Sequence, residues 1–135
     1  MENKYTPKKV TSNIYRFICI ICIVLTILRW ANVFNSDILV FNETINSHIS
    51  NFTISLLFYL AIGFIWMLQG VEFKHITLLG IIIILGNILC ETVMIFMNTP
   101  DIVDAIYGIV GTLVSFFFLL GIKKYGLVNE CKNAQ

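Results

Sequence analysis

Apolar residues in this chain fall into four long blocks that short polar segments separate. Each block has room for about 20 helical residues, the length that crosses a hydrocarbon layer of about 30 Å. The connections are too short to hold a separate soluble domain. The pattern therefore predicts an all-α, polytopic integral membrane protein, built as a four-helix transmembrane bundle. The expected order is a tail at 1–13, one membrane domain at 14–122 with helices at about 14–33, 52–71, 76–97 and 101–122, and a second tail at 123–135.

Composition and charge support this prediction and give it an orientation. Hydrophobic residues make up 58% of the chain and charged residues only 13%, which is unusual for a soluble domain. Basic residues flank the first and last blocks, whereas the connection between the first two blocks has no lysine, so both termini are expected to be cytoplasmic in a multi-pass plasma-membrane protein. The few basic residues lie at membrane flanks, so we expect no binding to nucleic acid.

The first block has a second interpretation, a cleaved signal peptide, because its apolar core at Phe17–Leu28 is short. No small-residue cleavage motif follows this core, and Arg29 and Trp30 occupy its place, which favours a retained span. Cys19 and Cys22 have the spacing of a redox pair, but an apolar helix disfavours thiolates. We therefore interpret them as small buried residues.

Polar residues interrupt the third and fourth blocks where hydrocarbon is expected. At a helical period, Asn87 and Glu91 share one face of the third helix, and Asp101 and Asp104 share one face of the fourth. Glu91 would lie roughly 9 Å and Asp104 roughly 6 Å inside the outer boundary. A carboxylate at such depth needs water, a cation or a hydrogen-bond donor. We predict an outward-facing polar pocket formed by Arg29, Asn87, Glu91, Asp101 and Asp104.

The tripeptide Asn98-Thr99-Pro100 joins these two helices and makes them antiparallel. The polar face of the third helix is therefore expected to meet the face of the fourth that carries its acidic and small residues. Pro100 suits the first turn of the fourth helix and Thr99 is the expected N-cap, which would place Asp101 within that first turn. Small residues are expected to allow close helix packing. These are Gly63 in the second helix and Gly108, Gly111 and Ser115 in the fourth.

Three of the polar residues keep alternative interpretations. Arg29 either extends to lipid headgroups or turns inward to pair with the acidic face. Glu91 is either functional or a protonated group that fastens helices by bonding to Asn87 or a backbone carbonyl. His48, in the expected long connection at 35–50, is either a polar loop residue or a ligand; the first is favoured, because no second His or Cys stands at metal-ligand spacing from it. No metal site, cofactor or catalytic residue is predicted.

Several stretches follow a known family pattern: Asn51, the run Leu60-Ala61-Ile62-Gly63-Phe64, Glu91 late in the third helix, Asp101-Ile102-Val103-Asp104, and Gly111. Over roughly 51–120 the chain resembles the VanZ-like membrane proteins. It departs from that family at five positions. The family has Pro where this chain has Ala61, Gln at Met94, Asp at Val103 and Asn at Gly108, and its Arg falls close to Thr99 or Pro100. The resemblance implies a bacterial inner-membrane protein of a family named for glycopeptide (teicoplanin) resistance. The expected level of Arg29 in the membrane makes it a candidate replacement for the family's Arg.

Three functions follow from these features. The first is a non-enzymatic VanZ-like envelope protein whose acidic pocket binds a cation, a lipid-linked headgroup or a partner helix. The second is a small interaction protein, such as an immunity or accessory subunit, that docks another membrane protein or a second copy through its small-residue stripe. The third is an intramembrane enzyme with Glu91 or Asp104 as general base. No nucleophile or phosphate-binding loop accompanies these carboxylates, so the enzyme is the least favoured.

Overall fold

The structure, a computed structural model of the 135-residue chain, describes residues 4–34, 42–92 and 101–129. Its elements in order are β1 (Tyr5–Pro7), α1 (Lys9–Phe34), α2 (Glu43–Leu68), α3 (Phe73–Thr92), α4 (Ile102–Gly121), a π-helical turn (Ile122–Gly126) and β2 (Leu127–Asn129). All four α-helices are long and apolar enough to cross a membrane. The prediction of an all-α bundle of four such helices is confirmed.

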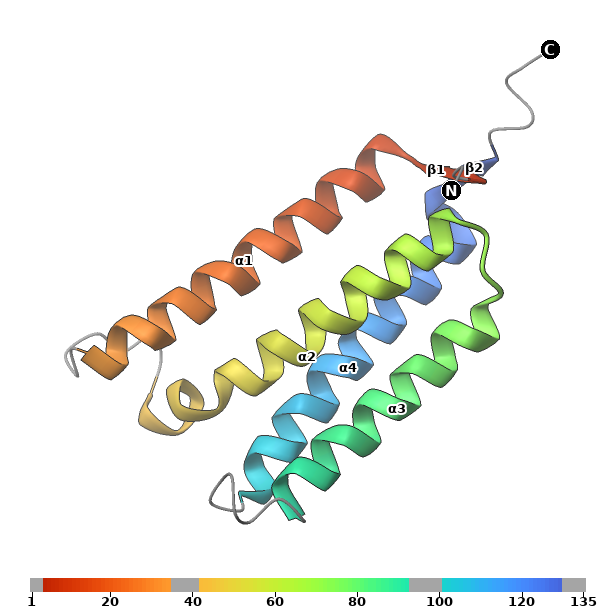
Figure 1. Cartoon of the computed structure of the whole chain (residues 1–135). Helices are drawn as coiled ribbons and strands as arrows, with labels where there is room; N and C mark the ends of the chain where they lie inside the picture. Colours follow the sequence, from red (N-terminus) through yellow and green to blue (C-terminus); the bar gives the residue numbers. More distant parts are fainter. Residues whose placement is uncertain (1–3, 35–41, 93–100, 130–135) are drawn as a thin grey trace.

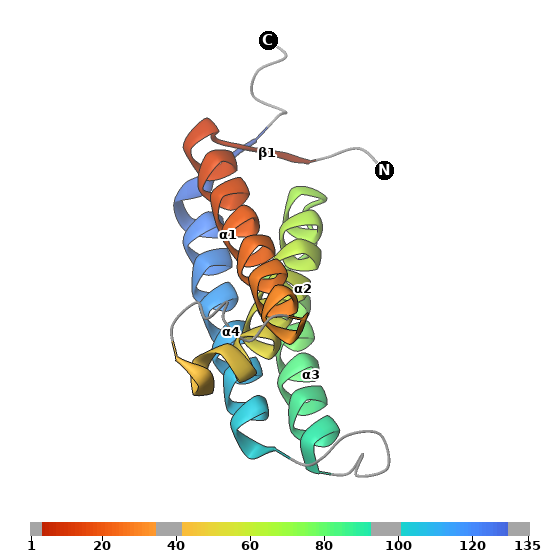
Figure 2. The same ribbon diagram turned by 90° about the vertical axis from the view of Figure 1, so that its left-hand side faces the viewer.

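Helices α2 and α4 form the centre of the bundle, with α1 and α3 on either side (Figures 1 and 2). The core lies mainly on these central helices and on the start of α3. Tyr59, Leu60, Ile76 and Leu119 are fully buried there. By contrast, α1 buries only Thr11 and Cys22, so most of its surface faces outward.

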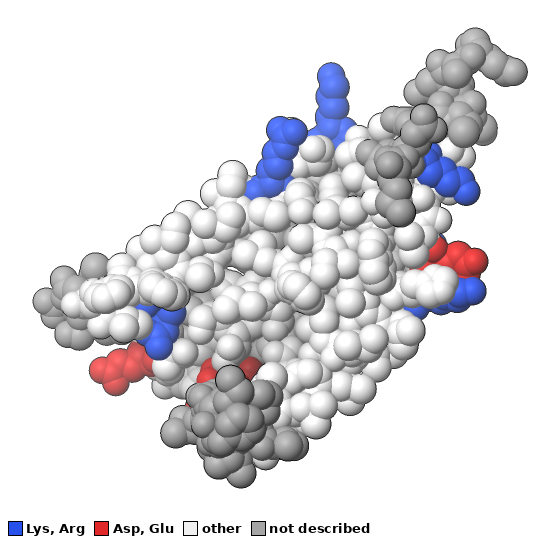
Figure 3. Space-filling model, viewed as in Figure 1, with Lys and Arg blue, Asp and Glu red and all other residues white. Residues whose placement is uncertain are grey.

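Apolar side chains cover the outside of the bundle. Phe17 on α1, Phe58 on α2, Ile82 on α3 and Phe117 on α4 are each more than half exposed. On the face shown in Figure 3, charged side chains lie toward the two ends and the surface between them is uncharged. A surface of this kind suits hydrocarbon better than water. The chain has the helices and the surface of a multi-pass membrane protein.

Small residues bring α4 close to its neighbours. A methyl group at Gly111 would collide with the backbone of Phe52, and the Ser115 hydroxyl donates to the Leu56 carbonyl of α2 at 2.7 Å. Gly108 instead lies against the side chain of Asn87 on α3. We expected the whole small-residue face to meet α3. The structure divides it, and Gly111 and Ser115 face α2.

Helix α2 begins at Glu43 rather than near Phe52, so residues 43–50 are helical instead of belonging to a long connection. Asn42 caps this helix, because its side-chain oxygen accepts a hydrogen bond from the Ile45 amide at 2.8 Å. The first turns of α2 are polar, which hides them from a search for apolar blocks. This extension places His48 on a helix.

Both predicted tails contain regular structure. Strands β1 and β2 pair antiparallel, with Tyr5 opposite Asn129, and α1 begins at Lys9 rather than near Ile14. The Lys8 amide also donates to the Gly126 carbonyl at 2.8 Å. These contacts join the two ends of the described chain at one end of the bundle, which we call the strand end.

Candidate metal-binding site

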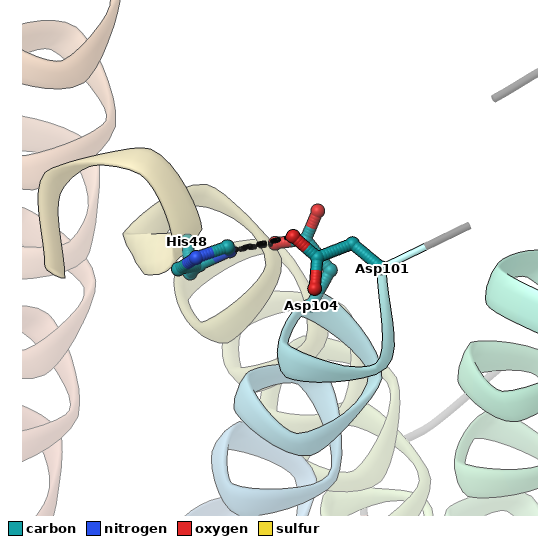
Figure 4. Close-up of side chains that lie close together, drawn as sticks. All are labelled: His48, Asp101 and Asp104. Atoms are coloured by element: carbon teal, nitrogen blue, oxygen red, sulfur yellow. Dashed lines mark hydrogen bonds and ion pairs between the residues drawn. The ribbon is translucent and has the colours of Figure 1, made fainter. Parts of the chain in front are cut away.

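Helices α2 and α4 place three ionisable side chains together at the end of the bundle opposite the strands. His48 comes from the second turn of α2, and Asp101 and Asp104 from the start of α4 (Figure 4). Asp101 is the N-cap of α4, because its side chain accepts from the Val103 amide at 2.9 Å. We expected Thr99 as the cap. Thr99 and Pro100 lie outside the described residues, and the cap observed at Asp101 corrects that prediction.

The three side chains converge on one point between the helices. His48 Nδ1 lies 2.8 Å from Asp104 Oδ1 and 3.8 Å from Asp101 Oδ2. One ligating atom from each of the three residues lies within 4.8 Å of the other two. The side chains of His48 and Asp104 are only 13% and 19% exposed, whereas Asp101 is 42% exposed. The cluster is therefore partly buried and opens to the outside at Asp101.

Neighbouring groups hold this cluster in place. The Tyr107 ring packs against the imidazole of His48, with ring centroids 5.5 Å apart. The buried Glu91 carboxylate of α3 accepts a long hydrogen bond of 3.4 Å from the Asp101 backbone amide. Glu91 thus contacts the start of α4 through the backbone of a cluster residue. This contact connects α3 to the same end of α4.

The remaining residues of the predicted pocket lie elsewhere. Asn87 accepts a hydrogen bond from the Ser55 hydroxyl at 3.2 Å and donates to the Ile83 carbonyl at 3.1 Å, so it links α3 to α2. Within the described part of the chain, Arg29 makes no ion pair with the pocket carboxylates, and its buried Nε has no hydrogen-bond partner. The inward pairing of Arg29 is not observed there. His48 contacts Asp104 instead.

An imidazole and two carboxylates can bind a divalent transition-metal ion. Imidazole nitrogen suits Zn²⁺ and related ions, and carboxylates suit Mn²⁺ as well. Ligands at about 2.0–2.1 Å from a tetrahedral ion stand about 3.3 Å from one another. The two distances from His48, 2.8 and 3.8 Å, lie on either side of that value. Three such ligands would leave the fourth tetrahedral position for water.

Sequence reasoning treated His48 as a polar loop residue and missed its role in this cluster. Asp101 and Asp104 stand three residues apart, a spacing that puts two ligands on one helical face. The sequence did not show that His48 lies on a neighbouring helix at the same depth in the bundle as the two aspartates. The depth of His48 can be inferred only when α2 is known to begin at Glu43.

No family model, no curated protein and no solved structure matches this chain. The VanZ-like resemblance stays a prediction.

Proposed function

We propose that this protein is a multi-pass plasma-membrane protein that binds a divalent transition-metal ion at its outer end through His48, Asp101 and Asp104. One observation carries the proposal. Three ligating atoms from two helices stand within 4.8 Å of one another in a partly buried cluster. The ion would join α2 to α4 and balance the negative charge of the two carboxylates.

The charges at the two ends of the bundle support this orientation. Lys4, Lys8 and Lys9 precede or begin α1, and Lys123 and Lys124 follow α4, so the strand end is the more basic. Positive residues concentrate on the cytoplasmic side of membrane proteins. The proposed topology therefore has both termini in the cytoplasm and the metal cluster outside.

A place in the bacterial envelope, and a part in glycopeptide resistance, form a separate proposal that rests on the VanZ-like resemblance. The metal cluster uses Asp101 and Asp104, two of the residues that carry this resemblance. In such a protein the bound ion could present an open coordination position to an anionic lipid-linked headgroup or to a partner helix. The site is proposed as a binding site, without a catalytic step.

The proposal is tested by metal binding to the purified protein in detergent micelles. The protein is stripped with a chelator and titrated by calorimetry with Zn²⁺ and, separately, Mn²⁺, in the wild type and in His48→Gln and Asp104→Asn. His75→Gln is the matched control, because His75 is an exposed histidine at the start of α3, toward the strand end. Glu72→Gln is the equivalent control for a carboxylate.

We expect the wild type to bind one Zn²⁺ or Mn²⁺ ion per chain. Loss of a group that only hydrogen-bonds to a metal ligand costs about 10–100-fold in metal affinity, so loss of a ligand itself at His48 or Asp104 should cost at least about that factor. His75→Gln and Glu72→Gln should bind as the wild type does. Equal affinity in the wild type and His48→Gln would contradict the proposal, as would a wild type that binds neither ion.

A further inference from the structure

A second candidate site lies at the strand end, far from the metal cluster. A pocket of about 710 Å³ opens there between β1, the turn that joins α2 to α3, and the segment that follows α4. Its size falls within the range of small-molecule sites, about 300–1,000 Å³. The described residues that line it include three lysines, Lys4, Lys74 and Lys123, and one acid, Glu72.

The charge of this pocket is positive. Glu72 pairs with Lys74, whose Nζ lies 2.6 Å from the Glu72 carboxylate. Lys4 and Lys123 are the other two ammonium groups, and each lies over an aromatic ring, Lys123 at 4.6 Å from the Phe73 centroid. An aromatic face orients an ammonium group without removing its charge. An anion that enters the pocket would therefore meet two positive groups that no carboxylate of the described chain neutralises.

The backbone holds these groups in place. The Lys4 amide donates to the Leu68 carbonyl at 2.9 Å, and Tyr5 is paired with Asn129 in the small sheet. Gly70 has a φ of 80°, and a methyl group there would stand 2.7 Å from Lys4 Cδ. The Lys4 side chain thus crosses the α2–α3 turn at a position that only glycine suits. The pocket is formed by contacts between segments far apart in the sequence.

We propose that this pocket binds the phosphate of an anionic phospholipid headgroup. The inference rests on the membrane insertion proposed above, but not on the metal site. The pocket lies at the end of the helices, where an inserted bundle meets the headgroups, and basic pockets at the cytoplasmic ends of spans bind anionic headgroups. Its lining also includes the apolar residues Met67, Val71 and Leu127, which suit the glycerol and the first acyl carbons.

Native mass spectrometry of the protein released from nanodiscs tests this proposal. Nanodiscs contain equal amounts of phosphatidylglycerol and phosphatidylcholine, and the lipids retained by each variant are counted. The variants are Lys4→Gln and Lys123→Gln. Lys124→Gln is the matched control, because it removes the same charge one residue away but does not line the pocket. Size-exclusion profiles show that each variant is folded.

The wild type should retain phosphatidylglycerol in preference to phosphatidylcholine. A pocket lysine that pairs directly with the phosphate should contribute up to about a fivefold preference, as a partly exposed ion pair does. Lys4→Gln and Lys123→Gln should each lower the preference about fivefold, and Lys124→Gln, which lies outside the pocket, by less than twofold. An equal loss in Lys124→Gln would overturn the proposal, because it would show general surface attraction. Absence of any phosphatidylglycerol preference would also overturn it.

Two further experiments distinguish a lipid headgroup from a soluble phosphate, and failure of the pocket from failure of membrane insertion. Millimolar glycerol 1-phosphate, added to the nanodiscs, should leave the bound lipid in place, and its complete displacement would assign the pocket to a soluble phosphate instead. Alkaline extraction of the source membranes tests insertion itself. Release of the protein by alkali would remove the membrane premise, whereas retention together with an absent lipid preference would overturn only the pocket.

Discussion

Gly111→Ala tests the close approach of α2 and α4, on which the geometry of the metal cluster depends. A Cβ atom at Gly111 would overlap the Phe52 carbonyl oxygen and would lie 3.1 Å from its carbonyl carbon and 3.3 Å from the Leu56 amide nitrogen. All three atoms belong to the α2 backbone. They cannot rotate away as a side chain would, so the alanine must push the two helices apart.

The expected loss of stability combines three effects. Overpacking a close contact costs about 1–3 kcal/mol. Separation of the helices also weakens the hydrogen bond from Ser115 to the Leu56 carbonyl, one turn along α4, at about 1 kcal/mol. Alanine gains about 0.5–1 kcal/mol over glycine within a helix. The net expectation is a destabilisation of about 1–3 kcal/mol.

Equilibrium unfolding of the purified protein in mixed micelles, with increasing SDS, measures this change. Gly86→Ala in α3 is the control, because, apart from the surrounding backbone of α3 itself, nothing lies within 4 Å of the added methyl group. It keeps the gain in helix propensity without the collision, so its stability should equal or exceed that of the wild type. If Gly111→Ala is as stable as Gly86→Ala, the helices do not approach as described.

Removal of two buried hydroxyl groups, those of Tyr59 and Ser115, should also lower the free energy of unfolding. Tyr59→Phe should lower the free energy of unfolding by about 1–2 kcal/mol, because the buried hydroxyl donates to the Ile76 carbonyl at 2.9 Å and joins α2 to α3. Tyr125→Phe, at an exposed tyrosine, should change it by less than 0.5 kcal/mol. Ser115→Ala should cost about 1 kcal/mol through loss of its bond to Leu56. The same SDS titration measures all three, and equal stability of Tyr59→Phe and Tyr125→Phe would contradict the α2–α3 link.

The number of helices and their apolar character could be predicted from the sequence, because a spanning helix leaves a long apolar block that needs no knowledge of its neighbours. The start of α2 could not. Its first turns, from Glu43 to Ser50, are polar and are stabilised by the Asn42 cap. The strands β1 and β2 are three residues each and pair across almost the whole chain, so no local pattern marks them.

The acidic half of the candidate site was visible in the sequence, whereas its histidine was not. Asp101 and Asp104 stand out because carboxylates are rare within or beside membrane-spanning segments. The sequence offers Arg29 as one candidate partner from its expected depth alone, with extension to the lipid headgroups as the alternative. Depth does not say which way a helix turns its side chains, and the described structure pairs Asp104 with His48 from α2.

Pulsed electron paramagnetic resonance of the Mn²⁺-loaded protein tests the proposed site most directly, because it detects the nitrogen of a coordinated imidazole. The account predicts one histidine nitrogen bound to Mn²⁺ in the wild type and in His75→Gln, and none in His48→Gln. A nitrogen signal that survives in His48→Gln, or a wild-type spectrum with no nitrogen coupling, would contradict the assignment of His48, Asp101 and Asp104 as a metal site.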